Sequence, residues 1–256
     1  MKTKVIIPIY RIPTPDEMCA MRNNCRILAA YDIAVLAPEG LDLSDTQREL
    51  GEEVEFIYVS DKWLGKRNGI AGYNRMMMSE EFYAMFSEWD YILICHSDAW
   101  IFSDSLQAWS DKGYDCVAAP WVRRRVYDLP LIKQYMSLRA WMRHRKGLKC
   151  RADLYGRIGN GGLSLRRVES FRTACRKYAD RIEEYMRGGS HLYNEDVFWA
   201  TEPQEFRYPA WREALEFAID TNPAYCYRLL GHLPMGCHSW TKPKMWRFWK
   251  EIIKKA

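Results

Sequence analysis

Four short stretches of this chain combine residue types that could bind and activate a phosphorylated substrate. The first is an apolar run, residues 91–95, which ends abruptly in His96, Ser97 and Asp98. A strand buried on both faces cannot hold a carboxylate in its middle, so we expect Asp98 at the rim of the sheet. A divalent ion bound there could bridge the oxygens of a diphosphate. Taken alone, Asp98 could equally be a helix cap or a turn former.

The second stretch places two adjacent carboxylates, Glu195 and Asp196, directly before an aromatic segment. Neighbouring carboxylates repel each other, so one of them can keep a raised pKa and act as a general base at neutral pH. The alternative is an ordinary helix N-terminus, with Asn194 as the cap and both acids near the positive end of the helix dipole.

The third and fourth stretches add glycines and a histidine. Gly161 and Gly162 belong to a Gly-Asn-Gly-Gly run that would let backbone amides approach a ligand closely, although a turn before an ordinary strand would look the same. His238 could supply a nitrogen ligand to the same ion, and Lys242 could neutralise a leaving diphosphate. A lone histidine is more often a hydrogen-bonded core or surface residue.

The elements that must position these residues follow an alternating pattern over the first 120 residues. Short β-branched runs predict strands at residues 5–9, 33–36, 54–59, 91–95 and 116–119. A capping box from Thr14 to Glu17 begins one helix, and further helices are predicted at residues 71–86 and 105–109. This order is typical of βαβ units and a largely parallel sheet, in which ligands bind at the carboxyl ends of the strands.

The second half of the chain departs from this pattern. A basic, aromatic-rich stretch at residues 121–151, helical after Leu131, is predicted to be an insertion over the sheet. A glycine-rich strand at residues 159–166 and a helix at residues 168–186 follow, and residues 242–256 form a basic aromatic tail. We find no repeats and no low-complexity linker, so we expect a single domain over residues 1–256.

Composition limits the classes of partner and compartment. The net charge of +5 is concentrated in a few segments, which argues against a nucleic-acid-binding surface. The eight cysteines form no CxxC pair, and we expect reduced, buried thiols in a cytoplasmic protein. The sequence predicts neither a signal peptide nor a membrane-spanning helix.

Contact with a membrane would therefore be peripheral. The insertion and the tail both place tryptophans among basic residues, and they could lie as amphipathic helices on the cytoplasmic face of an anionic bilayer, where lipid-linked acceptors reside. In the alternative, Trp246 and Trp249 pack on the domain and the lysines stay solvated.

Taken together and in order, these motifs resemble the GT-A superfamily of nucleotide-sugar glycosyltransferases. More closely, they are similar to a bacterial family of uncharacterised glycosyltransferase-like domains, and the likeness runs over residues 4–238. The motifs that carry it are YNRMM, HSD, APW, GNGGLSLR, NEDVFW and a late G-x-H. The resemblance implies an α/β fold of the GT-A type, a Rossmann-like, mostly parallel central sheet flanked by helices.

The resemblance also implies an activity. The protein would be a hexosyltransferase-like enzyme that moves a sugar from a nucleotide-diphosphate sugar to a hydroxyl of a glycan or lipid-linked saccharide, as in the synthesis of a surface polysaccharide. Asp98 would bind Mn²⁺ or Mg²⁺ on the donor diphosphate, and His238 would complete the metal site. Asp196, or its neighbour Glu195, would deprotonate the acceptor hydroxyl, with inversion if Asp196 lies opposite the leaving group.

Further roles carry over to matching positions. Pro8, Tyr10 and Asn74 would line the nucleotide pocket, and Trp121, Gly161 and Gly162 would face the sugar and the acceptor. His96 and Ser97 belong to the donor signature, but His96 stands where the usual signature has its first acid. Lys242, in a Lys-Pro pair like that of glycogenin-like transferases but closer to the histidine, would contact the diphosphate.

Three other classes of function remain open at this point. A non-catalytic nucleotide-sugar or glycan-binding protein would keep the fold without a working base. A sugar nucleotidyltransferase would favour a glycine-rich basic loop after the first strand, yet residues 8–13 contain no glycine. A metal-dependent hydrolase is the third class. The sequence leaves undetermined the donor nucleotide, the sugar, the acceptor, the linkage and the oligomeric state.

Overall fold

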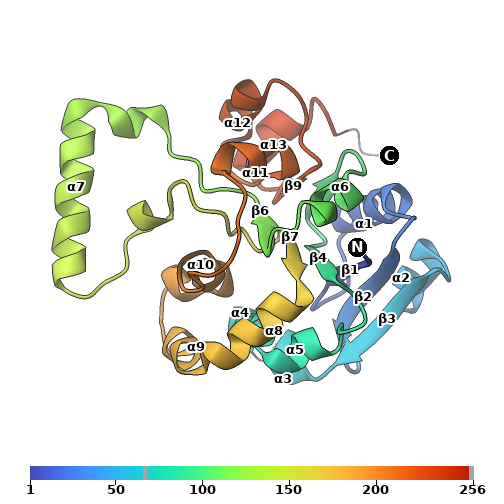
Figure 1. Ribbon diagram of the computed structural model, residues 1–256. Coiled ribbons are helices and arrows are strands. Elements are labelled where there is room, and N and C mark those ends of the chain that lie inside the picture. The colour runs from blue at the N-terminus through green and yellow to red at the C-terminus, as the bar shows by residue number, and fades with distance from the viewer. Residues whose placement is uncertain (66–67, 254–256) are drawn as a thin grey trace.

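The computed structural model describes residues 1–65 and 68–253, and it places a six-stranded sheet between two layers of helices (Figure 1). The strand order is β3-β2-β1-β4-β7-β6. Strands β1 to β4 run parallel, and β7 is antiparallel to both of its neighbours, β4 and β6. The strands are β1 (Thr3–Pro8), β2 (Asp32–Pro38), β3 (Val54–Val59), β4 (Tyr91–Cys95), β6 (Cys116–Ala118) and β7 (Leu163–Arg167).

A second, smaller sheet lies at the carboxyl end of β4. It has the order β5-β9-β8 and consists of β5 (Ala99–Ile101), β8 (Ala218–Ile219) and β9 (Gly236–His238). Its pairing puts Ala99 opposite His238. Two segments far apart in the sequence therefore meet beside the edge of the main sheet where ligands are expected.

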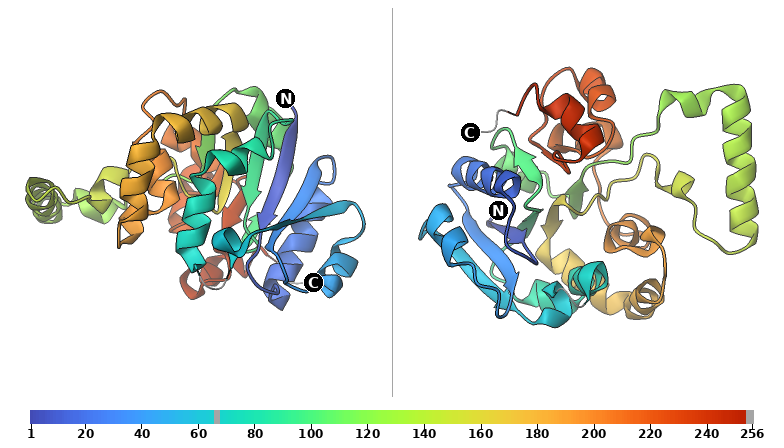
Figure 2. Two further views of the ribbon diagram at one scale, coloured as in Figure 1. Left: turned by 90° about the horizontal axis from the view of Figure 1, so that it is seen from below. Right: turned by 180° about the vertical axis from the view of Figure 1, so that it is seen from behind.

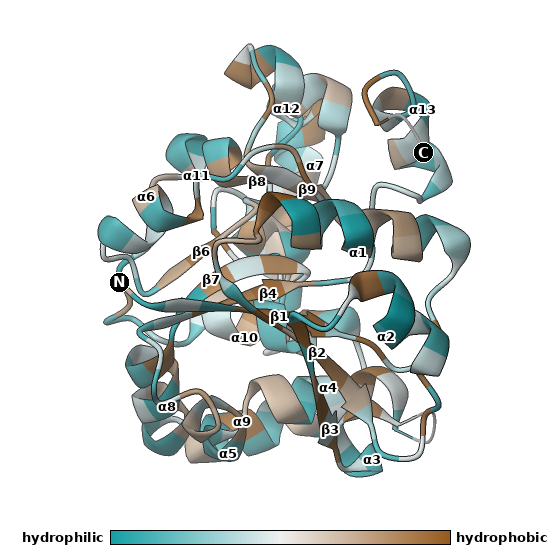
Figure 3. Cartoon of the chain, turned by 90° about the vertical axis from the view of Figure 1, so that its right-hand side faces the viewer, coloured by the Kyte–Doolittle hydropathy of each residue, from teal (hydrophilic) through white to brown (hydrophobic). Residues whose placement is uncertain are grey.

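Successive side chains along the central strands point alternately into two hydrophobic cores. Ile6 and Ile94 face one core, whereas Val5 and Ile7 face the other. Both faces of the sheet are thus covered, as is usual for parallel sheets. The colouring of Figure 3 follows this layering, with hydrophobic brown gathered on the central strands and more teal on the helices around them.

The helices divide between the two faces (Figure 2). Residues of the first core come from α3 (Asp61–Leu64), α4 (Gly69–Met77), α5 (Glu80–Ala84), α8 (Val168–Lys177), α9 (Ala179–Met186) and α10 (Glu195–Thr201). On the opposite face, α1 (Pro15–Ile27), α6 (Leu106–Asp111) and α11 (Trp211–Phe217) contribute to the second core, and α2 (Ser44–Leu50) packs near α1 and β3. Helix α1 begins with the predicted capping box of Thr14 and Glu17.

Two predicted helices are each interrupted. The helix expected at residues 71–86 is α4 followed by α5, because the hydroxyl of Ser79 accepts a hydrogen bond from the backbone of Phe82 and starts a new helix. The helix expected at residues 168–186 is α8 followed by α9, with a break at Tyr178. The strand expected at residues 159–166 begins only at Leu163, after the glycines.

The insertion projects from the body of the protein and does not cover the sheet as predicted (Figures 1 and 2). It contains a 3-10 turn η1 (Arg125–Asp128) and the helix α7 (Pro130–Arg145), and a second 3-10 turn η2 (Arg151–Leu154) begins at its last residue. No residue of α7 is buried. The sixteen residues of this helix therefore keep much of their surface available to partners.

The basic tail packs on the domain. Helix α13 (Pro243–Trp249) and α12 (Pro223–Leu230) join a third hydrophobic cluster in which Trp249 is fully buried, together with Met245 and Ile253. The alternative in which Trp246 and Trp249 pack on the domain is thus confirmed, since Trp246 is partly buried against the same cluster. The buried side chains of this cluster are not available to a bilayer. Residues 254–256 of the predicted tail lie outside the described residues.

The eight cysteines are free thiols, and six of them are buried. Across residues 1–65 and 68–253, the structure has no helix that is both long and apolar enough to cross a membrane.

Candidate active site

His96, Asp98 and His238 meet where β4 ends. His96 and Asp98 belong to the turn between β4 and β5, and the β5–β9 pairing brings His238 alongside. Nε2 of His238 lies 3.1 Å from Oδ1 of Asp98. One potential ligand atom from each of the three residues lies within 4.8 Å of the others. We call this group the His-Asp-His cluster.

Asp220, which the sequence did not single out, supports the cluster from behind. Its Oδ1 lies 2.7 Å from Nδ1 of His238, on the side of the ring away from Asp98. A carboxylate on the second ring nitrogen orients a histidine and is a common feature of metal sites. Nearby, Nζ of Lys242 donates a 2.8 Å hydrogen bond to Ser239.

The two histidines differ in charge because their neighbours differ. Burial alone would lower the pKa of His238, but hydrogen bonds and negative charge from Asp220 and Asp98 raise it to about 9. Burial, and then the nearby charge of His238, lower the pKa of His96 to about 3, so His96 is neutral. Burial opposes ionisation of Asp98, yet His238 holds the pKa of that carboxyl well below its usual range.

The donor set of the cluster fits a divalent transition metal. It offers two imidazoles and one carboxylate, all within reach of one ion. Mg²⁺ prefers a shell of oxygen ligands, whereas a mixed nitrogen and oxygen set suits a transition metal ion such as Mn²⁺ better. Tyr73, which we also did not predict, fixes the His96 ring through a 2.8 Å hydrogen bond between its hydroxyl and Nε2.

Gly161 and Gly162 lie between the cluster and the acid pair. A Cβ atom on Gly162 would overlap the His238 ring, and one on Gly161 would overlap the carboxylate of Glu195. The carbonyl of Gly162 accepts a 2.9 Å hydrogen bond from the backbone N–H of His96. A side chain at Gly162 would displace His238 and one at Gly161 would displace Glu195, so the close approach explains why both residues are glycine.

The acid pair stands at the N-terminus of α10, and its two members have different surroundings. Glu195 is buried, and both of its oxygens accept hydrogen bonds from Nη2 of Arg166, at 3.0 and 3.2 Å. Burial raises the pKa of Glu195 despite this partner. Because Arg166 already engages its carboxylate, Glu195 is poorly placed to take a proton from a substrate.

Asp196 has the properties of a base near neutral pH. It is partly exposed, and its Oδ1 accepts a 2.8 Å hydrogen bond from the backbone N–H of Val197. Burial, and then the negative charge of Glu195, raise the pKa of Asp196 to about 7. A carboxylate with that pKa accepts protons readily at physiological pH.

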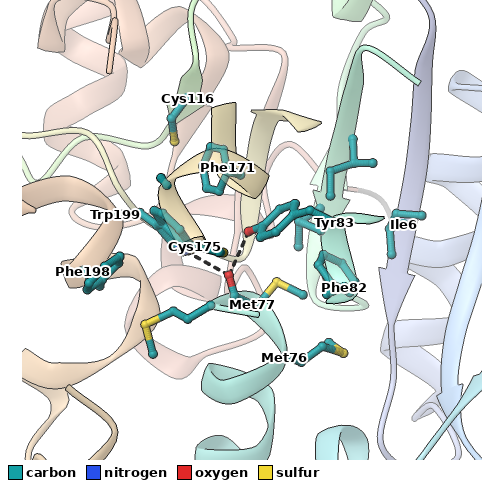
Figure 4. Close-up of a cluster of buried hydrophobic side chains, with 14 of the residues drawn as sticks. Ile6, Met76, Met77, Phe82, Tyr83, Cys116, Phe171, Cys175, Phe198 and Trp199 are labelled. Carbon is teal, nitrogen blue, oxygen red and sulfur yellow. Dashed lines mark hydrogen bonds between the residues drawn. The ribbon is translucent and has the colours of Figure 1, made fainter. Parts of the chain in front are cut away.

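The apolar half of the NEDVFW motif anchors the acids. Trp199 of α10 and Tyr83 of α5 both donate hydrogen bonds to the carbonyl of Met77, at 3.1 and 2.8 Å, which fixes α10 and α5 to the end of α4 (Figure 4). Asn74 adds a second link, since its amide donates to the Asn194 side chain and its oxygen accepts from the backbone of Glu195. Asn74, expected in the nucleotide pocket, is buried and uses its side chain to hold α10.

One protein-family profile matches most of the chain. The profile of the family described as "Protein of unknown function (DUF5672)" matches residues 53–238. The chain belongs to this family. The matched region contains the His-Asp-His cluster, both glycines and the acid pair, and it ends at His238. Pro8, Tyr10 and Lys242 lie outside it.

Three solved structures that are similar in fold to this chain are glycosyltransferases. The galactosyltransferase LgtC in complex with donor and acceptor sugar analogs has a TM-score of 0.51 at 15% identity, covering 93% of this chain and 86% of LgtC. An active-site mutant of LgtC gives 0.52 at 16% identity with the same coverage. The bifunctional glycosyltransferase WbbM gives 0.51 at 12% identity, covering 93% of this chain and 45% of WbbM. These similarities show the fold and confirm the predicted GT-A class; none of the curated proteins matches the chain.

The remaining predicted residues lie around the same edge. Pro8 ends β1 and is buried, and Tyr10 just beyond it is 56% exposed. The hydroxyl of Ser97 donates a 3.3 Å hydrogen bond to Glu17. Trp121 and Lys242 line a groove of about 1060 Å³ that also reaches Asp220. We call it the Trp121 groove.

Arg166 is a buried charge whose removal should be costly. Replacing it with Met leaves the Glu195 carboxylate buried without its partner, so we expect the free energy of unfolding to fall by about 3–5 kcal/mol. Urea unfolding measures the change. Arg176, which pairs with Glu80 on the surface, is the matched control, and Arg176→Met should cost no more than about 1 kcal/mol. Equal losses would mean that the buried pair does not hold this region.

Proposed function

We propose that this protein is a metal-assisted, inverting glycosyltransferase on a single GT-A-like domain, residues 1–256. It would transfer a sugar from a nucleotide-diphosphate sugar to a hydroxyl of a glycan or lipid-linked saccharide. The observation that carries the proposal is that Gly162 lies against His238 of the His-Asp-His cluster and Gly161 lies against Glu195, the neighbour of Asp196, whose pKa is raised to about 7. In an α/β sheet this edge is where ligands bind.

In this proposal the donor diphosphate lies at the His-Asp-His cluster. His96, Asp98 and His238 would hold Mn²⁺ or, less suitably, Mg²⁺, and a bound cation offsets the charge that develops on the departing diphosphate. Asp220 keeps the His238 ring oriented. Lys242 lies beside the cluster, linked through Ser239, and supplies further positive charge toward the leaving group.

The nucleotide and the acceptor would approach from different sides. Pro8 ends β1 and Tyr10 lies just beyond it, and both would contact the nucleotide, with Ser97 in the donor signature. Trp121 lines the groove on the other side and would contact the acceptor sugar. The backbone of Gly161 and Gly162 would face the transferred sugar, since neither residue has a side chain to exclude it.

Asp196 would take the proton from the attacking hydroxyl. Its raised pKa favours a catalytic protein over a non-catalytic nucleotide-sugar or glycan-binding protein, because binding alone does not need a base. If Asp196 lies across the anomeric carbon from the leaving group, the transfer proceeds with inversion. Glu195 would hold the N-terminus of α10 through Arg166.

We also propose peripheral contact with the cytoplasmic face of a membrane, through the insertion. Four apolar side chains of α7 recur at helical spacing and are 54–81% exposed: Leu131, Tyr135, Leu138 and Trp141. Basic residues lie among them. Lipid-linked acceptors would be presented at such a surface.

A thermal-shift screen of nucleoside diphosphates with Mn²⁺ or Mg²⁺ tests the donor site. Ligand at a hundred times its Kd adds about 2.7 kcal/mol, which corresponds to a rise in Tm of about 5–10 °C for a chain of this size. We expect one diphosphate to stabilise the protein selectively, and more with Mn²⁺ than with Mg²⁺ because of the two imidazoles. The same diphosphate in EDTA is the control. Indifference to every diphosphate would reject the proposal.

A further inference from the structure

The Trp121 groove is lined by an excess of positive charge. Its cationic side chains are Arg124, Arg139, Arg143, Arg151, Lys242 and Lys244. The acidic residue lining it is Asp220, and that carboxylate already pairs with His238. The groove therefore presents several uncompensated cations to whatever occupies it.

A second hollow extends the positively charged surface of the Trp121 groove. It has a volume of about 880 Å³ and shares Arg124, Asn222, Pro223 and Lys244 with the Trp121 groove. It adds Arg228 and other basic residues, and none of the described residues lining it is acidic. The cationic surface thus extends from the side of the cluster over α12 and α13.

Several arginines elsewhere on the surface pair with carboxylates. Arg172 and Arg176 both pair with Glu80, for example. Within residues 1–65 and 68–253, neither Arg139 nor Arg151 has a carboxylate within ion-pair distance. Clustered like charges repel one another, and an anionic ligand would relieve that repulsion.

We propose that the Trp121 groove binds the phosphate group of an acceptor, so that the acceptor is a phosphate- or diphosphate-bearing saccharide. This inference rests on the proposed glycosyltransferase function. The groove reaches the cluster side at Asp220 and Lys242, and it reaches the insertion at Arg139. An acceptor lying along it would place its hydroxyl toward Asp196 and its phosphate among the arginines of the insertion.

The residue type supports phosphate as the ligand. Four of the six cations are arginines, whose planar guanidinium can donate two parallel hydrogen bonds to phosphate oxygens. Arg124 and Arg143 are held in place by neutral groups, the side chain of Asn222 and the carbonyl of Lys149, so both keep their full charge. Arginines held this way lose less freedom when an anion binds.

Calorimetry with inorganic pyrophosphate measures binding to the groove. EDTA removes divalent cations, so the metal site does not contribute. The test variant is Arg139→Gln with Arg151→Gln. The matched control is Lys133→Gln with Arg145→Gln, which removes the same charge from exposed residues of α7 that do not line the groove. We expect the test pair to weaken binding about tenfold or more, and the control pair to weaken it less than about twofold.

Vesicles distinguish the two sources of phosphate. Co-sedimentation uses phosphatidylcholine with and without phosphatidylglycerol. If the groove takes a lipid headgroup, the test pair lowers binding to the anionic vesicles more than the control pair does. If it takes the phosphate of a soluble saccharide, only pyrophosphate separates the two variants. If neither probe separates them, the cations act as a diffuse charged surface and the proposal is overturned.

Binding of a nucleoside diphosphate with Mn²⁺ separates this inference from the function on which it rests. Both double variants should bind the nucleotide as the wild type does. Loss of nucleotide binding in the test pair would assign the groove to the donor and overturn the acceptor proposal. Failure of the wild type to bind any nucleoside diphosphate would instead reject the glycosyltransferase proposal, whatever pyrophosphate does.

Discussion

Replacing Asp196 with Asn should lower kcat by about 10²–10⁴-fold, the range expected for loss of a general base. The affinity for the nucleotide-diphosphate sugar should change little, because Asp196 is placed at the acceptor hydroxyl and not at the diphosphate. Asparagine has nearly the same shape and can still accept the hydrogen bond from the backbone of Val197. The substitution therefore removes the proton acceptor with little change to the N-terminus of α10.

Release of nucleoside diphosphate measures kcat, and calorimetry with the donor measures affinity. Asp180→Asn, at an exposed position of α9, is the matched control and should leave kcat within about twofold of the wild type. Transfer at the wild-type rate by Asp196→Asn would remove Asp196 from the mechanism. Loss of donor affinity in step with kcat would show that the residue acts in binding.

The pH dependence gives a second readout for Asp196. Since its pKa is raised to about 7, kcat/KM should rise with pH through that value as the carboxylate forms, and Asp196→Asn should lack this limb. Stability should change in the opposite sense. The folded state binds the proton on Asp196 more tightly than the unfolded chain does. The contribution of Asp196 to the free energy of unfolding is therefore complete below its ordinary pKa of 3.8 and is lost as the pH rises to about 7.

The sheet was predictable because its strands carry a strong local pattern. The runs at residues 54–59 and 91–95 are strands at those residues, since β-branched side chains that fill two cores leave little ambiguity. The breaks inside the predicted helices were harder to see. Ser79 caps α5 because its hydroxyl accepts a hydrogen bond from the backbone N–H of Phe82. The apolar pattern of the sequence continues across Ser79, so it does not reveal the break.

The orientation of the insertion could not be read from its sequence. Helix α7 has apolar residues on opposite sides, with Ile132 and Met136 partly covered and Leu131 and Leu138 exposed. Such a helix has no single apolar face, so the pattern does not say which side meets the protein. The expectation that it lies over the sheet was wrong for this reason.

The site was predictable where chemistry and strand ends coincide. Asp98 and His238 were expected to share a metal site, and the β5–β9 pairing does bring them together. Asp220 gave no local indication, because its position depends on the pairing of β8 with β9. Arg166 did carry an indication, since a charged residue inside a buried strand requires a buried partner, and Glu195 is that partner.

Replacing Asp98 with Asn should abolish the stabilisation by Mn²⁺ and nucleoside diphosphate, and should lower kcat/KM by at least about 10²-fold. Asp98 is the carboxylate of the three cluster residues, and the amide of asparagine carries no charge to hold a divalent cation. Its Oδ1 could still accept a hydrogen bond from His238, so the local fold should survive. Thermal shift and steady-state kinetics measure the two effects.

Asp220→Asn should give a milder effect than Asp98→Asn, because Asp220 contacts His238 but is not one of the three cluster residues. Loss of a carboxylate that orients a metal-bound histidine typically costs about 10–100-fold in metal affinity, so a higher Mn²⁺ concentration should restore this variant but not Asp98→Asn. A purely structural role for the cluster would lower the Tm of both variants in EDTA and leave neither responsive to added metal. A full response to Mn²⁺ in Asp98→Asn would show that the metal binds without Asp98 and would reject the His-Asp-His cluster as its site.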